Sequence, residues 1–314
     1  MSRIHEAMKK AEAERIRLGM TETAQADAGT ETPAILAERF PSLAAIRPQP
    51  ATATMEASPP STLEKRLAER SPAVSWKPDT NKMLFFDGNQ HALENEQFRT
   101  LRSRLFLLRK EAPLQKILVS SPLPKEGKSF VAANLAQAFA QQAEGRVLLI
   151  DGDLRSPMLH AQFGTISDPG LTNYLQGEVD EAEAIQHAPL ANLFFLPSGK
   201  SVKNPSELLG NGRLKTLLTG VAPWFDWIVF DSPPVIPISD AKLLAESCDG
   251  VLMVIAAAGT PTEMAQKACR EFRKNQVLGV VLNRAEKKIV YRSYVHEKSK
   301  GRRKGMGNEV RGNE

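Results

Sequence analysis

The apolar residues of this chain gather into short continuous runs that alternate with longer, periodic ones. Continuous runs of aliphatic residues are typical of strands buried on both faces of a sheet. The pattern predicts strands at Lys116–Ser121, Arg146–Asp151, Leu193–Leu196, Trp227–Asp231, Gly250–Ala256 and Val277–Leu282. Between several of them it predicts helices at Lys128–Ala143, Pro205–Thr219, Asp240–Glu246 and Pro261–Asn275. Such alternation indicates a mostly parallel sheet with right-handed crossovers, so the predicted fold is a doubly wound α/β domain.

The N-terminal part of the chain lacks this alternation. Residues 1–19 predict an amphipathic helix, because apolar residues recur there near helical spacing between lysines and arginines. Such a helix can contact a partner or a membrane surface, and its weak apolar face favours a partner. Residues 20–91 are rich in Ala, Thr, Pro, Glu and Ser and predict a disordered linker. A helix at Ala92–Lys110 then opens the folded domain, predicted over residues 92–286.

Composition and charge limit the size of the core, the expected cellular location and the kind of partner. The chain has 314 residues, of which 42% are hydrophobic, enough for one sizeable core. No apolar run is long enough to span a membrane and the start carries no secretory-signal pattern, which predicts a cytoplasmic protein. Cys248 and Cys269 are therefore expected to stay reduced. The net charge of +5 is uneven, with six basic residues against one acid between Lys298 and Arg311. Such a tail favours acidic partners, anionic lipid or nucleic acid, and a solvated end explains it equally well.

The segment between the first predicted strand and the helix after it has the layout of a phosphate-binding loop. It reads Ser-Ser-Pro-Leu-Pro-Lys-Glu-Gly-Lys-Ser over Ser120–Ser129. In such a loop, backbone N–H groups and the helix N-terminus surround the β- and γ-phosphates. Lys128 adds a positive charge on the phosphates, and the Ser129 hydroxyl can coordinate Mg²⁺. One position departs from the general pattern, because Pro122 stands where a glycine is usual.

Three aspartates end predicted strands. Asp151 and Asp153 close the second strand, and Asp231 closes the strand at Trp227–Asp231. The carboxyl ends of parallel strands meet at one edge of the sheet, so all three are expected beside the phosphate loop. Magnesium takes oxygen ligands, and phosphoryl transfer needs both the metal and a carboxylate that orients the attacking group. Each aspartate alone could be a helix N-cap, but together with Gly-Lys-Ser they predict a nucleotide site.

With these residues in place, the chain resembles the bacterial tyrosine kinases of polysaccharide export. These are P-loop NTPases of the deviant Walker type, related to the MinD/ParA ATPases. The matching stretches are Glu96–Arg102, Ser120–Ser129, Asn134–Ala136, Leu149–Pro157, Gly170–Leu171, Pro197–Gly199, Asn204–Leu209, Asp231–Pro234 and Gly279–Asn283. The Asp-x-Asp-Leu-Arg-x-Pro part of Leu149–Pro157 is the most specific of them, and Gly-Lys-Ser is the least specific.

The resemblance implies ATP and Mg²⁺ as cofactors and gives each site residue a role. Lys128 would contact the phosphates, while Asp151 would lie nearest the attacking tyrosine hydroxyl. A positioned carboxylate suits this step, because a phenol has a pKa of about 10. Metal ligands, directly or through water, would be Ser129, Asp153 and Asp231. Nucleotide contacts would come from Lys125, Glu126, Gly127, Lys128, Ser129 and Phe130, with Asn283 facing the adenine.

The resemblance also implies partners. Glu96, Arg99 and Arg102 match an intersubunit motif of a ring that presents tyrosine tails in trans; without the resemblance they are ordinary ion pairs on an exposed helix. Tyr291 and Tyr294, in the basic tail at residues 287–314, would be the phosphoacceptors, although the family usually has a larger tyrosine cluster. A separate membrane chain-length-determinant (Wzz-like) protein would activate the kinase at the inner membrane. Tyrosine-containing proteins are the expected substrates, and nucleic acid is not expected.

One residue departs from the family and two other functions remain open. Pro122 agrees with the family loop, but Lys125 replaces its middle glycine, and a lysine with positive φ there costs roughly 1 kcal/mol. Lys125 would tighten nucleotide binding or point to solvent. The first alternative is a MinD/ParA-like ATPase switch without kinase activity, which is disfavoured because Leu123 occupies the position of that group's extra lysine. The second is a catalytically weak scaffold with a poor nucleotide loop.

Overall fold

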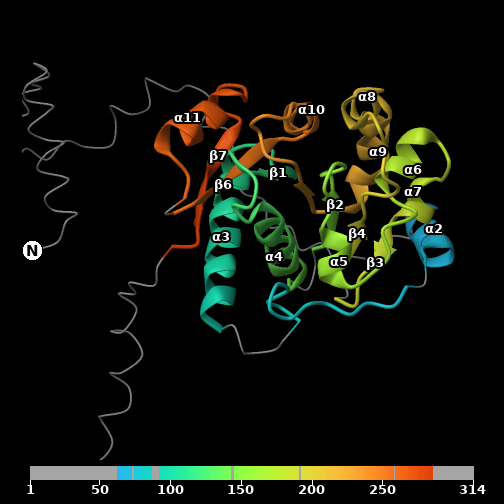
Figure 1. Cartoon of the computed structure of the whole chain (residues 1–314). Helices are drawn as coiled ribbons and strands as arrows, with labels where there is room; N and C mark the ends of the chain where they lie inside the picture. Colours follow the sequence, from blue (N-terminus) through green and yellow to red (C-terminus); the bar gives the residue numbers. More distant parts are fainter. Residues whose placement is uncertain are drawn as a thin grey trace, which may run out of the picture. The chain divides into compact units, whose positions relative to one another are not determined.

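The computed structural model describes residues 62–72, 74–86, 92–142, 145–190, 192–257 and 259–285. Its centre is a seven-stranded sheet in the order β3-β4-β2-β5-β1-β6-β7, parallel except for β3 (Figure 1). The strands are β1 Lys116–Ser120, β2 Val147–Asp151, β3 Gln186–His187, β4 Leu193–Leu196, β5 Trp227–Asp231, β6 Gly250–Ala256 and β7 Val277–Asn283. This confirms the predicted doubly wound, mostly parallel α/β fold.

Helices cover both faces of the sheet (Figure 1). One face packs against α3 (Ala92–Glu111), α4 (Lys128–Ala140) and α5 (Leu159–Phe163), where the rings of Phe139 and Trp227 stack at 4.2 Å. The other face packs against α2 Thr62–Arg70, α6 Leu171–Gln176, α7 Glu181–Ala184, α8 Pro205–Leu209, α9 Arg213–Val221, the 3-10 helix η2 Ala222–Trp224, α10 Asp240–Ala245 and α11 Thr262–Arg270. None of these described helices is both long and apolar enough to cross a bilayer.

The strand ends agree closely with the sequence pattern, whereas several helices differ. The helix predicted at Pro205–Thr219 is two helices, α8 and α9, because Gly212 between them has a φ of 83°. The helix predicted at Pro261–Asn275 ends at Arg270. The short elements α5, α6, α7 and β3 carry too few residues to show a periodicity, and the pattern did not predict them.

The predicted linker at residues 20–91 is wrong over residues 62–86, apart from residue 73, which lies outside the described part. Thr62–Arg70 forms α2, and its Leu63 and Leu67 are buried in the core. After α2 the chain crosses to the other face, where Met83 is fully buried and the Leu84 N–H donates to the Asn134 side chain over 2.9 Å. The apolar residues that dock this segment are few and separated by polar ones, so they left no clear period. The helix predicted at residues 1–19 lies outside the described residues.

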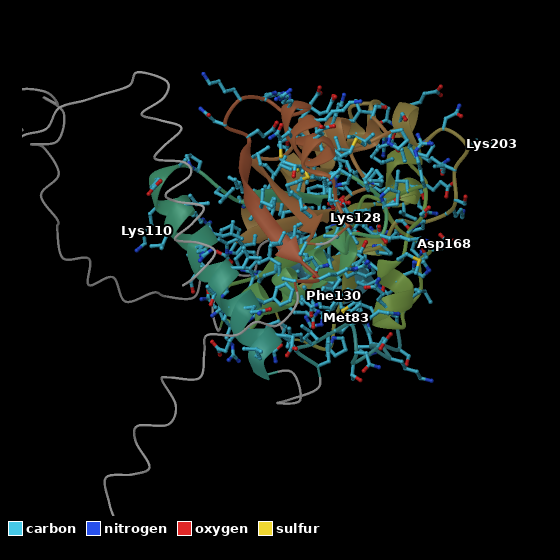
Figure 2. All side chains as sticks on the ribbon, turned by 60° about the vertical axis from the view of Figure 1, so that its left-hand side comes forward. Met83, Lys110, Lys128, Phe130, Asp168 and Lys203 are labelled. Atoms are coloured by element: carbon cyan, nitrogen blue, oxygen red, sulfur yellow. The ribbon has the colours of Figure 1, made fainter. Side chains whose placement is uncertain are left out.

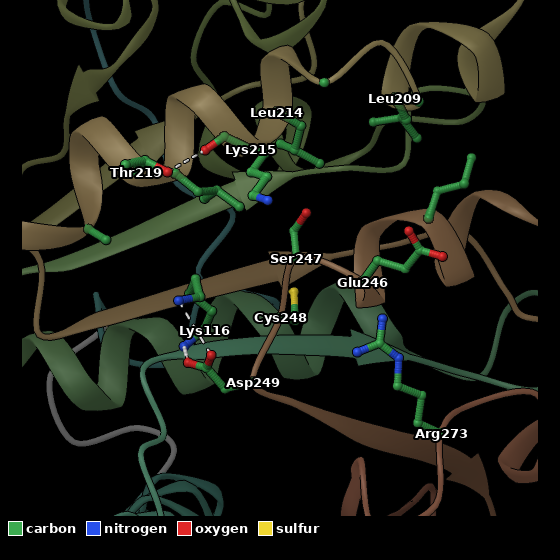
Figure 3. Close-up of a pocket in the computed structure, with 15 residues that line it drawn as sticks. Lys116, Leu209, Leu214, Lys215, Thr219, Glu246, Ser247, Cys248, Asp249 and Arg273 are labelled. Atoms are coloured by element: carbon green, nitrogen blue, oxygen red, sulfur yellow. Dashed lines mark hydrogen bonds and ion pairs between the residues drawn. The ribbon is translucent and has the colours of Figure 1, made fainter.

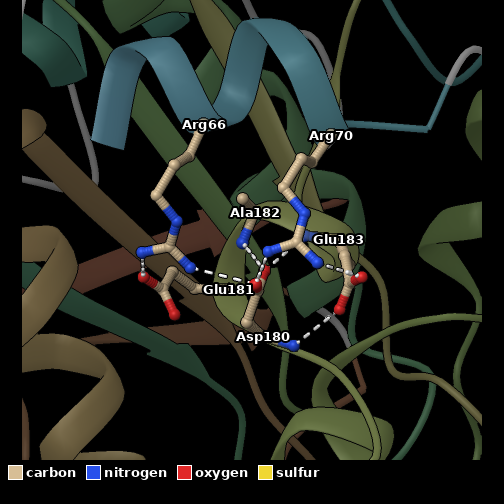
Figure 4. A network of polar contacts seen from close by, with 6 residues as sticks. All are labelled: Arg66, Arg70, Asp180, Glu181, Ala182 and Glu183. Atoms are coloured by element: carbon tan, nitrogen blue, oxygen red, sulfur yellow. Dashed lines mark hydrogen bonds and ion pairs between the residues drawn. The ribbon is translucent and has the colours of Figure 1, made fainter. Parts of the chain in front are cut away.

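Ion pairs fix α2 to the start of α7 (Figure 4). Asp180 is the N-cap of α7 and accepts hydrogen bonds from the N–H groups of Ala182 and Glu183 over 2.9 and 3.0 Å. Arg66 and Arg70 both pair with Asp180, and Arg70 also reaches Glu183 over 2.6 Å. The basic face of α2 therefore meets an acidic helix N-terminus, where negative charge is already favoured.

Candidate nucleotide and magnesium site

The loop between β1 and α4 has the conformation of a phosphate-binding loop. Gly127 is the N-cap of α4 and has a φ of 98°, so the helix N-terminus begins at Lys128. A Cβ atom on Gly127 would lie 2.1 Å from Asn283 Nδ2 and would displace that side chain, and the φ of 98° strains any residue with a Cβ atom, so both observations favour glycine. Lys125 has a φ of 65°, the left-handed conformation expected where the family has glycine, and its side chain is exposed. Lys125 therefore occupies a backbone conformation that glycine adopts more readily.

Two side chains, one from the loop itself and one from β7, hold the loop backbone. The Glu126 side chain is buried, and its Oε2 accepts a hydrogen bond from the Leu123 N–H over 2.7 Å. The Asn283 amide, at the end of β7, donates to the Glu126 carbonyl over 2.8 Å. Asn283 was predicted to face the adenine; it lies against the loop and also lines the cavity described below.

The three predicted aspartates meet at the carboxyl edge of the sheet. Asp151 and Asp231 are paired in register on the adjacent strands β2 and β5, and both are fully buried. Asp153 follows two residues after Asp151, and its Oδ2 lies 3.1 Å from the Lys128 ammonium. Asp151 accepts hydrogen bonds from the backbone N–H groups of Asp153 and Leu159, each over 3.3 Å. The structure therefore brings the lysine and all three carboxylates together, as predicted from strand ends.

Burial and mutual repulsion shift the protonation of this cluster. Burial raises the pKa of Asp151 well above its ordinary value, and the nearby Asp231 and Asp153 carboxylates raise it further. Burial also raises the pKa of Asp231 to about 6, although the Lys128 ammonium and the Ser129 hydroxyl act against this shift. For Lys128, burial would lower the pKa, but Asp231 and Asp153 outweigh burial and raise it. A cation in this place would stabilise the ionised carboxylates.

One atom in the cluster indicates how a metal ion would fit. The Oδ2 of Asp231 is buried and has no hydrogen-bond partner within the described part of the chain, although its neighbour Oδ1 accepts from the Ser232 N–H. Buried carboxylate oxygens are usually hydrogen-bonded, and a cation or a water beside this oxygen would satisfy it. The described residues contain no group of three His, Cys, Asp or Glu side chains that alone could hold a metal. Mg²⁺ keeps waters and takes phosphate oxygens together with one or two carboxylates, so the Asp153 and Asp231 carboxylates and the Ser129 hydroxyl are donors of the kind that it takes.

A cavity of about 730 Å³ opens in front of this cluster. Its wall includes Lys125, Gly127, Lys128, Ser129, Phe130, Asp153, Arg155, Pro233, Asn283 and Arg284. Lys128 is labelled near the centre of the view in Figure 2, and its side chain is only 14% exposed. Phe130 also packs edge-on against Phe98 of α3, with ring centroids 5.8 Å apart. The volume suits a nucleotide, and the loop, Lys128 and Asp153 line this space. Asp151 and Asp231 lie behind them, fully buried, and do not line the cavity.

A second cavity, of about 550 Å³, lies at the other end of the strands (Figure 3). Lys116, the first residue of β1, and Asp249, just before β6, line it together with residues of α9 and α10. Ligands of doubly wound sheets bind at the carboxyl ends of the strands, and none of the predicted site residues lines this second cavity. The candidate nucleotide site is therefore the cavity beside the phosphate loop.

The predicted interface residues lie on α3, and none of them lines the candidate nucleotide cavity. Glu96 and Arg99 form an exposed ion pair of 2.5 Å one turn apart. Arg102 instead turns inward, and its guanidinium donates to the Ala138 carbonyl in the last turn of α4 over 2.6 Å. Arg102 thus holds α3 on α4 within one chain. Tyr291 and Tyr294 lie outside the described residues.

Sequence reasoning gave no role to a further basic residue at the cavity. Arg155 lines the cavity and forms an ion pair with the buried Asp240, Nε to Oδ2, of 2.7 Å. Ser206 joins the pair by donating to Asp240 over 2.5 Å and accepting from Arg155 over 3.0 Å. Arg155 lies inside the Asp-x-Asp-Leu-Arg-x-Pro segment, which was the available signal, but Asp240 comes from α10 and could not be paired with it from sequence.

The chain is similar to known nucleotide-binding proteins and kinases. Residues 118–311 match the family model described as the CobQ/CobB/MinD/ParA nucleotide binding domain. The chain is 36% identical over 194 residues to the tyrosine-protein kinase YwqD of Bacillus subtilis, covering 61% of this chain and 81% of YwqD. It is 34% identical over 200 residues to the tyrosine-protein kinase CpsD of Streptococcus agalactiae serotype III, covering 62% and 84%.

A solved structure with the same arrangement is the kinase domain of the Escherichia coli tyrosine kinase ETK. It matches with a TM-score of 0.56 and 28% identity, over 63% of this chain and 79% of that domain. The phosphate loop, the strand-end aspartates and these similarities lead to one assignment. The chain belongs to the bacterial tyrosine-protein kinases, within the MinD/ParA-like nucleotide-binding family.

Proposed function

We propose that this protein is an ATP-dependent protein-tyrosine autokinase that regulates exopolysaccharide or capsule synthesis and export. The observation that carries the proposal is the cluster of Asp151, Asp153 and Asp231 beside Lys128 at the phosphate loop. Its relatives YwqD and CpsD are named tyrosine-protein kinases. ATP and Mg²⁺ are the proposed cofactors, because the buried, unpartnered Asp231 oxygen and the family both favour a nucleotide with its metal.

In this proposal, different residues bind the phosphates and the metal ion. The N–H groups at the start of α4 and the Lys128 ammonium hold the β- and γ-phosphates, and the Phe130 and Asn283 side chains line the cavity beside them. Mg²⁺, held by Ser129, Asp153 and Asp231 directly or through water, would supply the positive charge that offsets the phosphate oxygens. These contacts fix the γ-phosphate in line for attack, which is the main requirement of this reaction class.

Asp151 acts on the attacking tyrosine in this proposal. The tyrosine oxygen forms a bond to the γ-phosphorus while the bond from that phosphorus to the β,γ-bridging oxygen breaks, and ADP leaves. The phenolic proton passes to the Asp151 carboxylate. The raised pKa of Asp151 suits this role, because a carboxylate accepts a proton better as its pKa rises toward the working pH.

The phosphoacceptors in the proposal are Tyr291 and Tyr294 of a neighbouring copy, and other tyrosine-containing proteins are further substrates. Tyr174 is a poor acceptor by comparison, because it is buried in the core. A homo-oligomeric ring would form through the α3 helix with Glu96 and Arg99 at its surface, Arg102 being engaged within its own chain. A membrane chain-length-determinant protein of the Wzz type would bring the kinase to the inner membrane and activate it.

One experiment separates the proposal from its alternatives. The purified protein is incubated with ATP and Mg²⁺, with and without the cytoplasmic segment of the membrane partner, and phosphotyrosine is mapped. Label on Tyr291 or Tyr294 that disappears in Lys128→Met and persists in the exposed-lysine control Lys203→Met supports the kinase. Hydrolysis of ATP without phosphotyrosine supports the MinD/ParA-like switch, and failure to bind nucleotide leaves only the scaffold.

A further inference from the structure

Hydrogen bonds to Glu126 connect the segments at the ends of three neighbouring strands. The order of the sheet places β1, β6 and β7 side by side, and the phosphate loop follows β1. Asn283, the last residue of β7, donates to the Glu126 backbone carbonyl over 2.8 Å. Thr260, in the loop after β6, donates its hydroxyl proton to Oε1 of the Glu126 carboxylate. The other carboxylate oxygen, Oε2, accepts from the Leu123 N–H over 2.7 Å. Glu126 thus accepts one hydrogen bond from the end of β7, one from the loop after β6 and one from its own loop.

The hydroxyl of Thr260 is itself held in a fixed direction. It accepts a hydrogen bond from the Ala256 N–H at the end of β6 over 3.1 Å, and the Thr260 N–H donates to the Ala256 carbonyl over 3.2 Å. A hydroxyl has one proton to donate, and with the Ala256 N–H occupying its oxygen that proton points at Glu126. The turn after β6 therefore presents one donor to the phosphate loop in a defined geometry.

Hydrogen bonds to Glu126 affect the loop more than hydrogen bonds elsewhere would, because of the backbone conformation on either side of it. It lies between Lys125 and Gly127, whose φ values of 65° and 98° are both left-handed. Left-handed residues on both sides of Glu126 turn the chain sharply. The backbone orientation of Glu126 therefore sets the direction of the N–H groups that follow it. Those N–H groups, at Gly127 and Lys128, are the ones that face the phosphates of a bound nucleotide. The Glu126 side chain is buried and does not line the cavity, so its carboxylate contacts the protein and not the cavity space.

We infer that Thr260 is a positioning residue for the phosphate loop, acting through the Glu126 carboxylate. Its hydroxyl keeps the Lys125–Gly127 backbone in the conformation that binds the diphosphate part of a nucleotide. This inference rests on the proposed function only in requiring that the site binds a nucleoside di- or triphosphate. It adds a residue from the β6–α11 turn to a site otherwise built by the ends of β1, β2, β5 and β7.

The test compares Thr260→Val, which has nearly the same shape but no hydroxyl, with Thr260→Ser, which keeps the hydroxyl. Thr262→Val makes the same change at an exposed position two residues away. Isothermal titration calorimetry measures the Kd of the full-length protein for ADP·Mg²⁺ and ATP·Mg²⁺. Loss of a hydrogen bond to a charged group predicts about a tenfold weaker Kd in Thr260→Val. Thr260→Ser and Thr262→Val should bind like the wild type.

A double-mutant cycle shows whether Thr260 acts through Glu126. In a Glu126→Gln background, Thr260→Val should weaken ADP binding less than in the wild type, because the charged acceptor is already gone. The KM for ATP should rise in Thr260→Val more than kcat falls, and the Tm of the nucleotide-free protein should change little. Full additivity of the two substitutions, or wild-type ADP affinity in Thr260→Val, overturns the inference. Failure of the wild type to bind ADP would instead overturn the proposed function, and the inference with it.

Discussion

Asp151 and Asp231 lie opposite each other on the adjacent parallel strands β2 and β5, with both carboxyl groups fully buried. Two carboxylates in such a position repel each other, and water cannot screen the repulsion. The arrangement is unfavourable for the protein alone and becomes favourable when a cation lies beside it. The Lys128 ammonium supplies part of that charge, and the unpartnered Asp231 oxygen indicates where more is required.

The first prediction is that Asp231→Asn stabilises the metal-free protein at pH 8. The pKa of Asp231 is about 6 in the folded state against an ordinary value of 3.8, so the folded protein holds this proton more tightly than the unfolded chain. Stability from this group is therefore present below about pH 4 and is lost as the pH rises to about 6. Asparagine does not ionise, so the free energy of unfolding should rise by about 1–3 kcal/mol at pH 8.

Urea unfolding in the presence of a chelator measures this effect, and the same pair of proteins at pH 4 is the control, where the difference should shrink toward zero. Mg²⁺-dependent ADP binding should be lost in the same variant. A variant that is less stable than the wild type at pH 8 would show that the Asp231 charge is already compensated in the metal-free protein.

The second prediction concerns the positive φ of Lys125. Lys125→Gly should raise the free energy of unfolding by up to about 1 kcal/mol, because glycine adopts a left-handed conformation without the Cβ clash. Lys125→Ala removes the same charge but keeps the Cβ atom, and it should leave stability unchanged. Since the Lys125 side chain is exposed, neither change should alter the Kd for ADP more than about threefold. A tenfold loss of ADP affinity in both variants would mean that the Lys125 charge acts on the phosphates.

The third prediction separates Arg102 from Arg99 on the same helix. Arg102→Ala should lower the free energy of unfolding by about 1–2 kcal/mol, because it removes a charged hydrogen bond from α3 to the last turn of α4. Arg99→Ala should change it by less than about 0.5 kcal/mol, because an exposed pair one turn apart contributes little. Urea unfolding of both variants at a concentration where the protein is monomeric makes the comparison. Equal effects would contradict the inward role of Arg102.

The fourth prediction tests whether α2 belongs to the folded domain. Leu67→Ala should lower the free energy of unfolding by about 2 kcal/mol, because it removes a buried side chain from the core beside α7. Lys65→Ala, on the exposed side of the same helix, is the matched control. Limited proteolysis provides a second readout, since cleavage between residues 62 and 86 should be slow in the wild type and faster in Leu67→Ala. Rapid cleavage of the wild type in this segment would contradict the docked position of α2.

The parts of the fold that could be predicted are those with long or repeated patterns. The strands are continuous apolar runs buried on both faces, and a parallel sheet brings their carboxyl ends to one edge whatever the details of packing. That is why Asp151 and Asp231 could be placed beside Lys128 from the sequence. The segment at residues 62–86, which includes α2, was not predicted to fold. Its buried residues Leu63, Leu67 and Met83 pack only against residues that are distant in the chain.

The remaining parts of the site depend on tertiary contacts. Nothing in the sequence pairs Arg155 with Asp240, or Thr260 with Glu126, because the partners come from segments 85 and 134 residues apart. The positive φ of Lys125 could be anticipated only through the glycine of related loops. For Arg102, the sequence motif correctly predicted the helix on which it lies. It could not predict the direction of the side chain, which depends on the end of α4.

In the proposed kinase reaction, the Asp151 carboxylate accepts the proton of the attacking tyrosine hydroxyl. The most direct measurement is phosphopeptide mapping of the full-length protein after incubation with ATP and Mg²⁺, comparing the wild type with Asp151→Asn. The predicted result is phosphate on Tyr291 or Tyr294 in the wild type and at least a hundredfold slower labelling in Asp151→Asn, with ATP binding retained in both. ATP hydrolysis without any phosphotyrosine in the wild type, or undiminished labelling in Asp151→Asn, would contradict it.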